Sequence, residues 1–199
     1  MKAPSGHAVV VPIRSFAAAK TRLASVLSDA DRRALARHCA EVVLRAAQPL
    51  RVYVVCDDAE VTEWARTHAA SVISPGISGL NEAAAAGRAA ARADGYHSVI
   101  VIHADLPQVE SLAPLTKEDT DVVIVPDRHG DGTNALVVPT GGEFVFRYGP
   151  GSSDAHRHEA ARVGLTWRLL QRADVALDLD TIDDLRAAGL DAASLRSSD

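Results

Sequence analysis

The sequence predicts an α/β protein with a mostly parallel open sheet and helices on both faces. Short apolar runs rich in Val and Ile lie at residues 8–12, 52–56, 99–102 and 121–125. Each is long enough for a strand that is buried on both sides. The runs are separated by stretches with helical spacing of apolar residues, and this alternation is typical of parallel sheets.

Composition and charge exclude several functional classes. The chain has 199 residues, 47% of them hydrophobic, which suits one soluble globular domain. Its 26 acidic residues outnumber 21 Lys and Arg, and no basic run offers a surface for nucleic acid or an anionic membrane. No apolar stretch approaches the roughly 18 residues that span a bilayer, and no signal peptide is evident. We therefore expect a cytoplasmic protein that binds neither nucleic acid nor membrane.

Each element is predicted from its own spacing of apolar residues. Strands are β-branched runs that stop at Pro, Gly or acidic residues, and helices carry their apolar residues on one face. Ser28 or Asp29 can cap the first long helix, and Thr181 with Asp184 can cap the last. The predicted strands lie at 8–12, 52–56, 71–73, 99–102 and 121–125. The predicted helices lie within 13–23, between Ser28 and Pro49, after Asp58 through Trp64, at 80–95, at 154–163 and after Thr181, with further apolar runs at 135–138, 144–148 and 175–179.

The polar residues that follow the strands are the candidates for a binding site. In open α/β sheets, ligands bind at the carboxyl ends of the parallel strands. Cations follow the first strand and a carboxylate follows the run at 99–102, which suits an anionic substrate held partly by Lys or Arg and partly through a metal ion. The candidates are Arg14, Lys20, Asp57, Asp58, Asp105, Asp127 and Arg128.

Asp178 and Asp180 form a second acidic group. In an extended chain, residues i and i+2 point to the same side, so both carboxylates would project together while Leu177 and Leu179 pack inward. Two like charges so close need a cation, and Mg²⁺ prefers hard oxygen ligands of this kind. The other interpretation is a solvated strand end that only caps the following helix. Together with Asp105, the pair favours a magnesium site.

Two Gly-rich segments with hydroxyl side chains lie at 130–136 and 148–153. Such loops let backbone N–H groups approach an anion, although Gly-rich turns have the same composition. A dinucleotide-binding fingerprint and a Walker-type phosphate loop are both missing from the sequence, which argues against a Rossmann oxidoreductase and a P-loop NTPase. His156 could assist a phosphate but is expected at the surface, and His103 is expected to pack beneath the site.

In combination and in order, these motifs resemble the guanylyltransferases that make the deazaflavin coenzyme F-420, which act on 2-phospho-L-lactate or phosphoenolpyruvate. The resemblance extends from about Val9 to Leu185. The segments that carry it are 11–12, 20–23, 79–81, 104–107, 126–128, 132–136, 148–152 with His156, 178–181 and 184–185.

The resemblance implies a glycosyltransferase-A-like nucleotidyltransferase fold and transfer of GMP from GTP to the phosphate of a small phospho-acid, with release of pyrophosphate. It implies one domain over 1–199, with a nucleotide-binding half at 1–128 and an acceptor and metal half at 129–199. The implied catalytic residues are Lys20, Arg22 and Asp105. The implied nucleotide site is Pro12, Lys20, Gly79, Asn81 and Asp105, the acceptor site is Thr133, Gly149 and Ser152, and the Mg²⁺ ligands are Asp105, Asp178 and Asp180.

The acceptor remains open among phosphoenolpyruvate, 2-phospho-L-lactate and 3-phosphoglycerate, with phosphoenolpyruvate preferred. A nucleotidyltransferase for sugar phosphates would carry a Gly-rich loop after the first strand, and residues 14–17 contain no glycine. A non-catalytic nucleotide-binding module is the alternative of another class, and it would not need three carboxylates. A homodimer is a reasonable expectation for a small enzyme of this kind.

Overall fold

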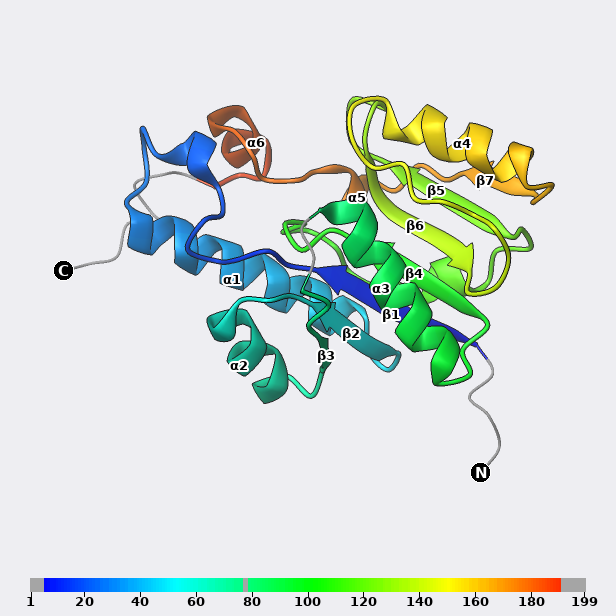
Figure 1. Ribbon diagram of the computed structural model, residues 1–199. Helices are drawn as coiled ribbons and strands as arrows, with labels where there is room; N and C mark the ends of the chain where they lie inside the picture. Colours follow the sequence, from blue (N-terminus) through cyan, green and yellow to red (C-terminus); the bar gives the residue numbers. More distant parts are fainter. Residues whose placement is uncertain (1–5, 77–78, 191–199) are drawn as a thin grey trace.

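The protein is described from a computed structural model, and the description is of residues 6–76 and 79–190. One seven-stranded sheet has the order β3-β2-β1-β4-β6-β5-β7 (Figure 1). All neighbouring strands are parallel except β6, which runs antiparallel to both β4 and β5. The strands are β1 (His7–Pro12), β2 (Arg51–Val55), β3 (Ser71–Ile73), β4 (Ser98–Ile102), β5 (Val122–Pro126), β6 (Thr133–Pro139) and β7 (Trp167–Leu169).

Helices cover both faces of the sheet. The helices are α1 (Asp29–Ala46), α2 (Ala59–Thr67), α3 (Leu80–Ala93), α4 (Ser152–Arg162), α5 (Ala173–Ala176) and α6 (Ile182–Ala187), with 3-10 turns η1 (Thr21–Leu23) and η2 (Ala113–Thr116). Side chains of α1 and α2 share one hydrophobic core with one face of the sheet, and those of α3 and α4 share a second core with the other. Figure 1 shows α3 lying across β1 and β4, on the opposite side from α1.

Successive side chains of β1 point to opposite faces of the sheet, so the strand contributes to both cores. Val9 and Val11 belong to the core under α1, whereas Ala8 and Val10 belong to the core under α3. The helix α3 approaches closely because Gly87 faces the strand, where a Cβ atom would lie 2.3 Å from a methyl carbon of Val10. The small side chains of this Ala-rich helix therefore let it pack close to the strand, and its first residue, Leu80, lines the same two cavities as Pro12 at the end of β1.

The predicted strands and long helices are confirmed, as is the mostly parallel sheet. Ser28 caps α1 by accepting a hydrogen bond from the backbone N–H of Asp31. The strand β7 was not predicted, because its three residues, Trp-Arg-Leu, are too few to set a pattern apart and all are exposed. Within the described residues, no helix is both long and apolar enough to cross a membrane.

Two of the predicted apolar runs are not strands. The run at 175–179 begins in the single turn of α5, and the residues after it are extended without joining the sheet. The run at 144–148 has no regular structure, although Phe144 and Phe146 are buried against the α3 face of the sheet. In both segments the apolar side chains bury themselves against other elements instead of pairing with a strand.

Candidate functional site

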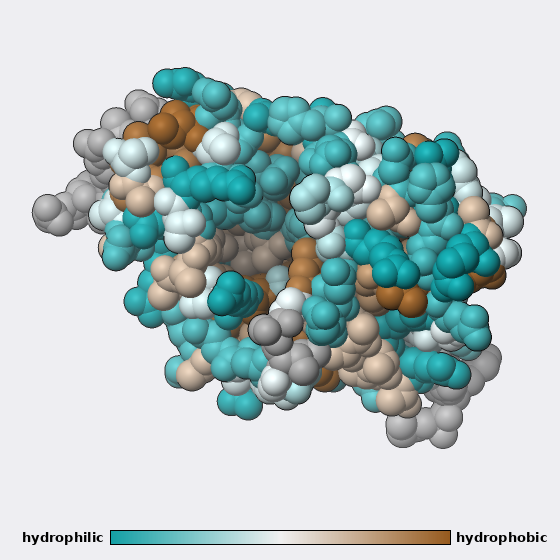
Figure 2. Space-filling model, turned by 45° about the horizontal axis from the view of Figure 1, so that its top comes forward, coloured by the Kyte–Doolittle hydropathy of each residue, from teal (hydrophilic) through white to brown (hydrophobic). Residues whose placement is uncertain are grey.

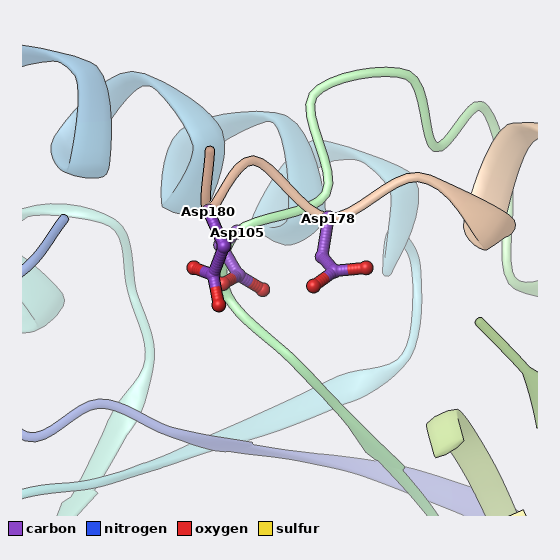
Figure 3. Close-up of side chains that lie close together, drawn as sticks. All are labelled: Asp105, Asp178 and Asp180. Carbon is purple, nitrogen blue, oxygen red and sulfur yellow. The ribbon is translucent and has the colours of Figure 1, made fainter. Parts of the chain in front are cut away.

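Three carboxylates meet at the carboxyl end of β4. Asp105 follows this strand, and Asp178 and Asp180 come from the extended segment before α6 (Figure 3). One oxygen atom of each carboxylate lies within 4.8 Å of the others. The backbone N–H of Leu179 donates a hydrogen bond to the carbonyl of Asp105 at 3.2 Å, which holds the two segments together. The predicted side-chain alternation is therefore present, although the segment is not a strand.

Lys20 lies among these carboxylates. Its ammonium group is 2.7 Å from Asp105 Oδ2 and 3.2 Å from Asp180 Oδ1, and its side chain is only 4% exposed. Its backbone is left-handed, with φ 58°, at the start of η1. Arg22 is 74% exposed and lies 3.6 Å from Asp180, so it stands at the rim. One buried cation therefore compensates part of the charge of three acidic groups.

The surroundings shift the pKa values of Asp105 and Asp178 in opposite directions. Burial opposes ionisation of Asp105, but the ammonium of Lys20 outweighs it and the pKa of Asp105 lies below its ordinary value. The pKa of Asp178 is raised, first by burial and then by the negative charge of Asp105. Burial lowers the pKa of Lys20, and its partner Asp105 more than restores it. Asp178 is thus the carboxylate that would gain most from an added cation.

The donor set suits a hard divalent cation. Asp105 Oδ1 is shut off from solvent and has no hydrogen-bond partner among the described residues. Buried carboxylate oxygens in native proteins usually have a partner, so this atom has capacity for a ligand. Three carboxylates that converge without sulfur or imidazole favour magnesium-like ions over zinc.

Asp184 and Arg128 hold the acidic segment in place. Asp184 is 6% exposed and accepts hydrogen bonds from the backbone N–H of Asp180 at 3.0 Å and of Thr181 at 2.6 Å. Its second oxygen lies 2.6 Å from the guanidinium of Arg128. Thr181 caps α6 reciprocally with Asp184, as predicted. Because Asp184 takes the capping role, the carboxylate of Asp180 is free to face the site.

Asn134 is a supporting residue that the sequence did not single out for this role. It is 2% exposed and donates from Nδ2 to the carbonyls of Val175 at 2.9 Å and Ala176 at 3.1 Å. The same nitrogen lies 3.5 Å from Asp178 Oδ1. The available signal in the sequence was the position of Asn134 next to Thr133 in a Gly-rich segment.

Other polar residues after the strands build loops. Asp58 caps α2 by accepting from the backbone N–H of Val61, and Asp57 accepts from that of Gly76. Asp127 accepts from three backbone N–H groups of its own turn. These carboxylates were candidates for ligand binding, and their contacts are those of turn and cap formation.

Two adjoining cavities open beside the carboxylates, and Figure 2 shows this face hollowed, with apolar surface at the floor and hydrophilic residues around it. The first has a volume of about 310 Å³ and includes Lys20, Asp105 and Asp180 in its wall. The second, of about 750 Å³, lies between the ends of β1 and β2 and the start of α3. The residues that both share are Pro12, Ile13, Arg14 and Leu80.

The predicted nucleotide residues are brought together only in part. Pro12 lines both cavities and Gly79 lines the second. The Asn81 side chain is engaged elsewhere: its Oδ1 accepts from the backbone N–H of Tyr148 at 2.7 Å, and its Nδ2 donates to the Tyr148 carbonyl at 3.2 Å. Asn81 therefore fixes the loop after 144–147 to the amino end of α3.

The predicted acceptor residues form a separate hydrogen-bonded group. Ser152 Oγ donates to Thr133 Oγ1 at 3.1 Å, and Thr133 Oγ1 is also 3.1 Å from His156 Nδ1. The backbone N–H of Arg147 donates to His156 Nε2 at 3.0 Å, so the ring proton lies on Nδ1. Gly149 accepts from the Ser152 backbone N–H. The expectation of a surface His156 is wrong, because the ring is fully buried under this loop.

The burial of His156 predicts acid sensitivity. Burial lowers its pKa to about 4, against 6.5 in an unfolded chain. The unfolded chain takes up this proton first, so stability present above pH 6.5 is lost as the pH falls towards 4, by roughly 3 kcal/mol. Urea unfolding at pH 7, 6, 5 and 4 measures this loss. The loss between pH 6.5 and 5 should be clearly smaller in His156→Gln, which leaves the half-buried His7 in place, and an equal loss in both proteins would contradict the assignment.

A family model described as "Guanylyl transferase CofC like" matches residues 7–193. A phosphoenolpyruvate guanylyltransferase from Rubrobacter xylanophilus is 38% identical over 184 residues, which is 88% of this chain and 90% of that protein. A 3-phospho-D-glycerate guanylyltransferase from Phenylobacterium zucineum is 32% identical over 88% of this chain and 86% of its own length.

Solved structures support the fold. A protein from Desulfovibrio desulfuricans G20, provisionally described as a nucleotide-diphospho-sugar transferase, has a TM-score of 0.74 at 18% identity over 93% of this chain and 87% of its own. A 4-diphosphocytidyl-2C-methyl-D-erythritol synthase has a TM-score of 0.62 at 14% identity over 93% of this chain and 97% of its own. The predicted nucleotidyltransferase fold is therefore confirmed.

Proposed function

This chain belongs to the family of CofC-like guanylyl transferases, and from that membership we propose that it transfers GMP from GTP to the phosphate of phosphoenolpyruvate. Pyrophosphate leaves, and the product is a step towards coenzyme F-420. The observation that carries the proposal is the convergence of Asp105, Asp178 and Asp180 around the buried Lys20, at the wall of a cavity. The relative from Rubrobacter xylanophilus supports phosphoenolpyruvate as the acceptor.

The reaction brings two anions together, and the site has the groups to offset their repulsion. Mg²⁺ held by the three aspartates would neutralise triphosphate charge and polarise the α-phosphate. The Lys20 ammonium has three N–H donors, two of which point to Asp105 and Asp180, so one remains for a phosphate oxygen. Lys20 would then stabilise the charge that develops on the departing pyrophosphate.

The remaining residues position the two substrates. Pro12, Gly79 and the start of α3 would border the nucleoside, with Asn81 acting through the loop that it fixes. Arg22 at the rim would contact the outer end of the triphosphate. Thr133, Gly149 and Ser152 would hold the acceptor, so that residues 1–128 serve the nucleotide and 129–199 the acceptor and, together with Asp105, the metal. The acceptor phosphate is already ionised near neutral pH, so the transfer needs positioning and charge neutralisation and no general base.

Pyrophosphate release tests the function. We expect release with Mg²⁺ and GTP plus phosphoenolpyruvate, and little release with ATP. The matrix of acceptors should also contain 2-phospho-L-lactate, 3-phosphoglycerate and a sugar 1-phosphate, each with both nucleotides. Selective use of one of the other phospho-acids would keep guanylyl transfer and correct the acceptor, and the relative from Phenylobacterium zucineum makes 3-phosphoglycerate the first of these to examine. GTP binding without turnover of any acceptor would favour a non-catalytic nucleotide-binding module.

A further inference from the structure

Asn134 joins the two chain segments that carry the carboxylates. It lies near the start of β6, where its backbone carbonyl accepts a hydrogen bond from the N–H of His103 at 3.0 Å, two residues before Asp105. Its side-chain Nδ2 donates to the carbonyls of residues 175 and 176 at 2.9 and 3.1 Å, shortly before Asp178. One buried residue therefore ties the end of β4 to the segment of Asp178.

Asp178 is the carboxylate of this group that lacks a cation. Lys20 pairs with Asp105 and Asp180, whereas no Lys or Arg of the described residues pairs with the third carboxylate. Within the same part of the chain, the only side-chain donor that reaches Asp178 is Asn134 Nδ2, 3.5 Å from its Oδ1. The negative charge of Asp105 repels that of Asp178, so the segment of Asp178 needs another contact to stay in place.

We propose that Asn134 is a positioning residue of the metal site: its amide holds Asp178 beside Asp105, so that the carboxylates already converge before a divalent cation binds. This inference rests on the proposed function, which needs the cation. The preceding residue, Thr133, points to the opposite face of the sheet, where it contacts His156. The start of β6 therefore serves the proposed acceptor group with one residue and the carboxylates with the next.

Asn134→Ala tests the proposal through the binding of Mn²⁺, which prefers the same oxygen ligands as Mg²⁺ and is detected by electron paramagnetic resonance without any turnover. We expect the dissociation constant for Mn²⁺ to rise about 10- to 100-fold, as for other residues that orient metal ligands. The Mg²⁺ concentration for half-maximal pyrophosphate release should rise by a similar factor, while the KM values for GTP and phosphoenolpyruvate at saturating Mg²⁺ stay unchanged. Asn134→Ser, which keeps one donor, should show a smaller rise, and it provides the same test if Asn134→Ala does not fold.

Arg172→Met is the matched control, because Arg172 fixes the same segment at its other end. Its side chain pairs with Asp174 at 2.6 Å and donates to the carbonyl of Ser111 at 3.0 Å, and its hydrogen bonds among the described residues reach none of the three carboxylates. This variant should lose stability without a change in the dissociation constant for Mn²⁺.

An unchanged dissociation constant in the Asn134 variants, or an equal rise in Arg172→Met, would contradict this inference and leave Asn134 with a structural role only. Binding of Mn²⁺ by a wild type that turns over no phospho-acid would contradict the proposed function, while the comparison of the variants would still decide this inference. A wild type that binds no Mn²⁺ would contradict the metal site, and this inference with it.

Discussion

Asp105→Asn is expected to lower kcat by about 10³-fold or more while the protein remains folded. Asp105 is the point at which the carboxylate group, the Lys20 ammonium and the first cavity meet. The asparagine keeps the size of the side chain, removes one negative charge from the proposed metal site and directs an amide or a carbonyl at the ammonium. The measurement is kcat from pyrophosphate release at saturating GTP and acceptor, with circular dichroism as the test of folding.

Asp121→Asn is the control for this loss. The pKa of Asp121 is also below its usual value, because Thr166 donates hydrogen bonds to its carboxylate. Asp121 precedes β5, however, and so lies at the opposite end of the sheet. It should retain the kcat of the wild type. Retention of more than about a tenth of kcat by Asp105→Asn would remove Asp105 from the metal site and with it the proposed mechanism.

Lys20→Met is the second variant with a large expected effect. Removal of the buried Lys20 ammonium leaves Asp105 without its ion-pair partner and leaves Asp180 with only the exposed Arg22. Breaking a buried pair costs about 3–5 kcal/mol. The melting temperature in EDTA should therefore fall. A divalent cation would then replace the lost positive charge, so Mg²⁺ should raise the melting temperature more in Lys20→Met than in the wild type. We expect kcat to fall by about 10²-fold or more, because the proposed mechanism also places the lysine against the triphosphate.

Arg22→Met is the control that shows whether the effect of Lys20→Met comes from the loss of a buried charge or from the loss of any positive charge. Arg22 carries the same charge on the same turn, but it is largely exposed and lies 3.6 Å from Asp180. Exposed pairs contribute little to stability, so its melting temperature in EDTA should stay close to that of the wild type. A larger Mg²⁺ response in Arg22→Met than in Lys20→Met would contradict the placement of the compensating charge at Lys20.

Local patterns predicted the sheet, and tertiary contacts decided the exceptions. Runs of Val and Ile are buried on both sides in β1, β2, β4 and β5, and such runs are recognisable from the sequence alone. The strand β7 is short and its side chains are exposed, so burial of its side chains does not explain why it pairs with β5. It pairs through its backbone, beside Val122 to Ile124. Leu177 and Leu179 alternate as in a strand because both are buried, although the segment pairs with no strand.

The convergence of the carboxylates was predicted from the rule that ligands bind at the carboxyl ends of parallel strands. The rule holds for Asp105 after β4, whereas the segment with Asp178 and Asp180 joins no strand and is held to Asp105 by the backbone N–H of Leu179. Other contacts between residues far apart in sequence were not predicted. Asn81 turns its amide to Tyr148, and His156, which was expected at the surface, is buried. Each of these depends on how the 144–151 segment packs against α3 and α4.

Phosphorus NMR of the product tests the central claim most directly, because the claim concerns which bond forms. After incubation with GTP, phosphoenolpyruvate and Mg²⁺, the account predicts two mutually coupled phosphorus signals from a new phosphate–phosphate link, together with free pyrophosphate. Asp105→Asn should give neither. Formation of GDP and inorganic phosphate, or pyrophosphate without the coupled pair, would contradict transfer of GMP to the acceptor phosphate.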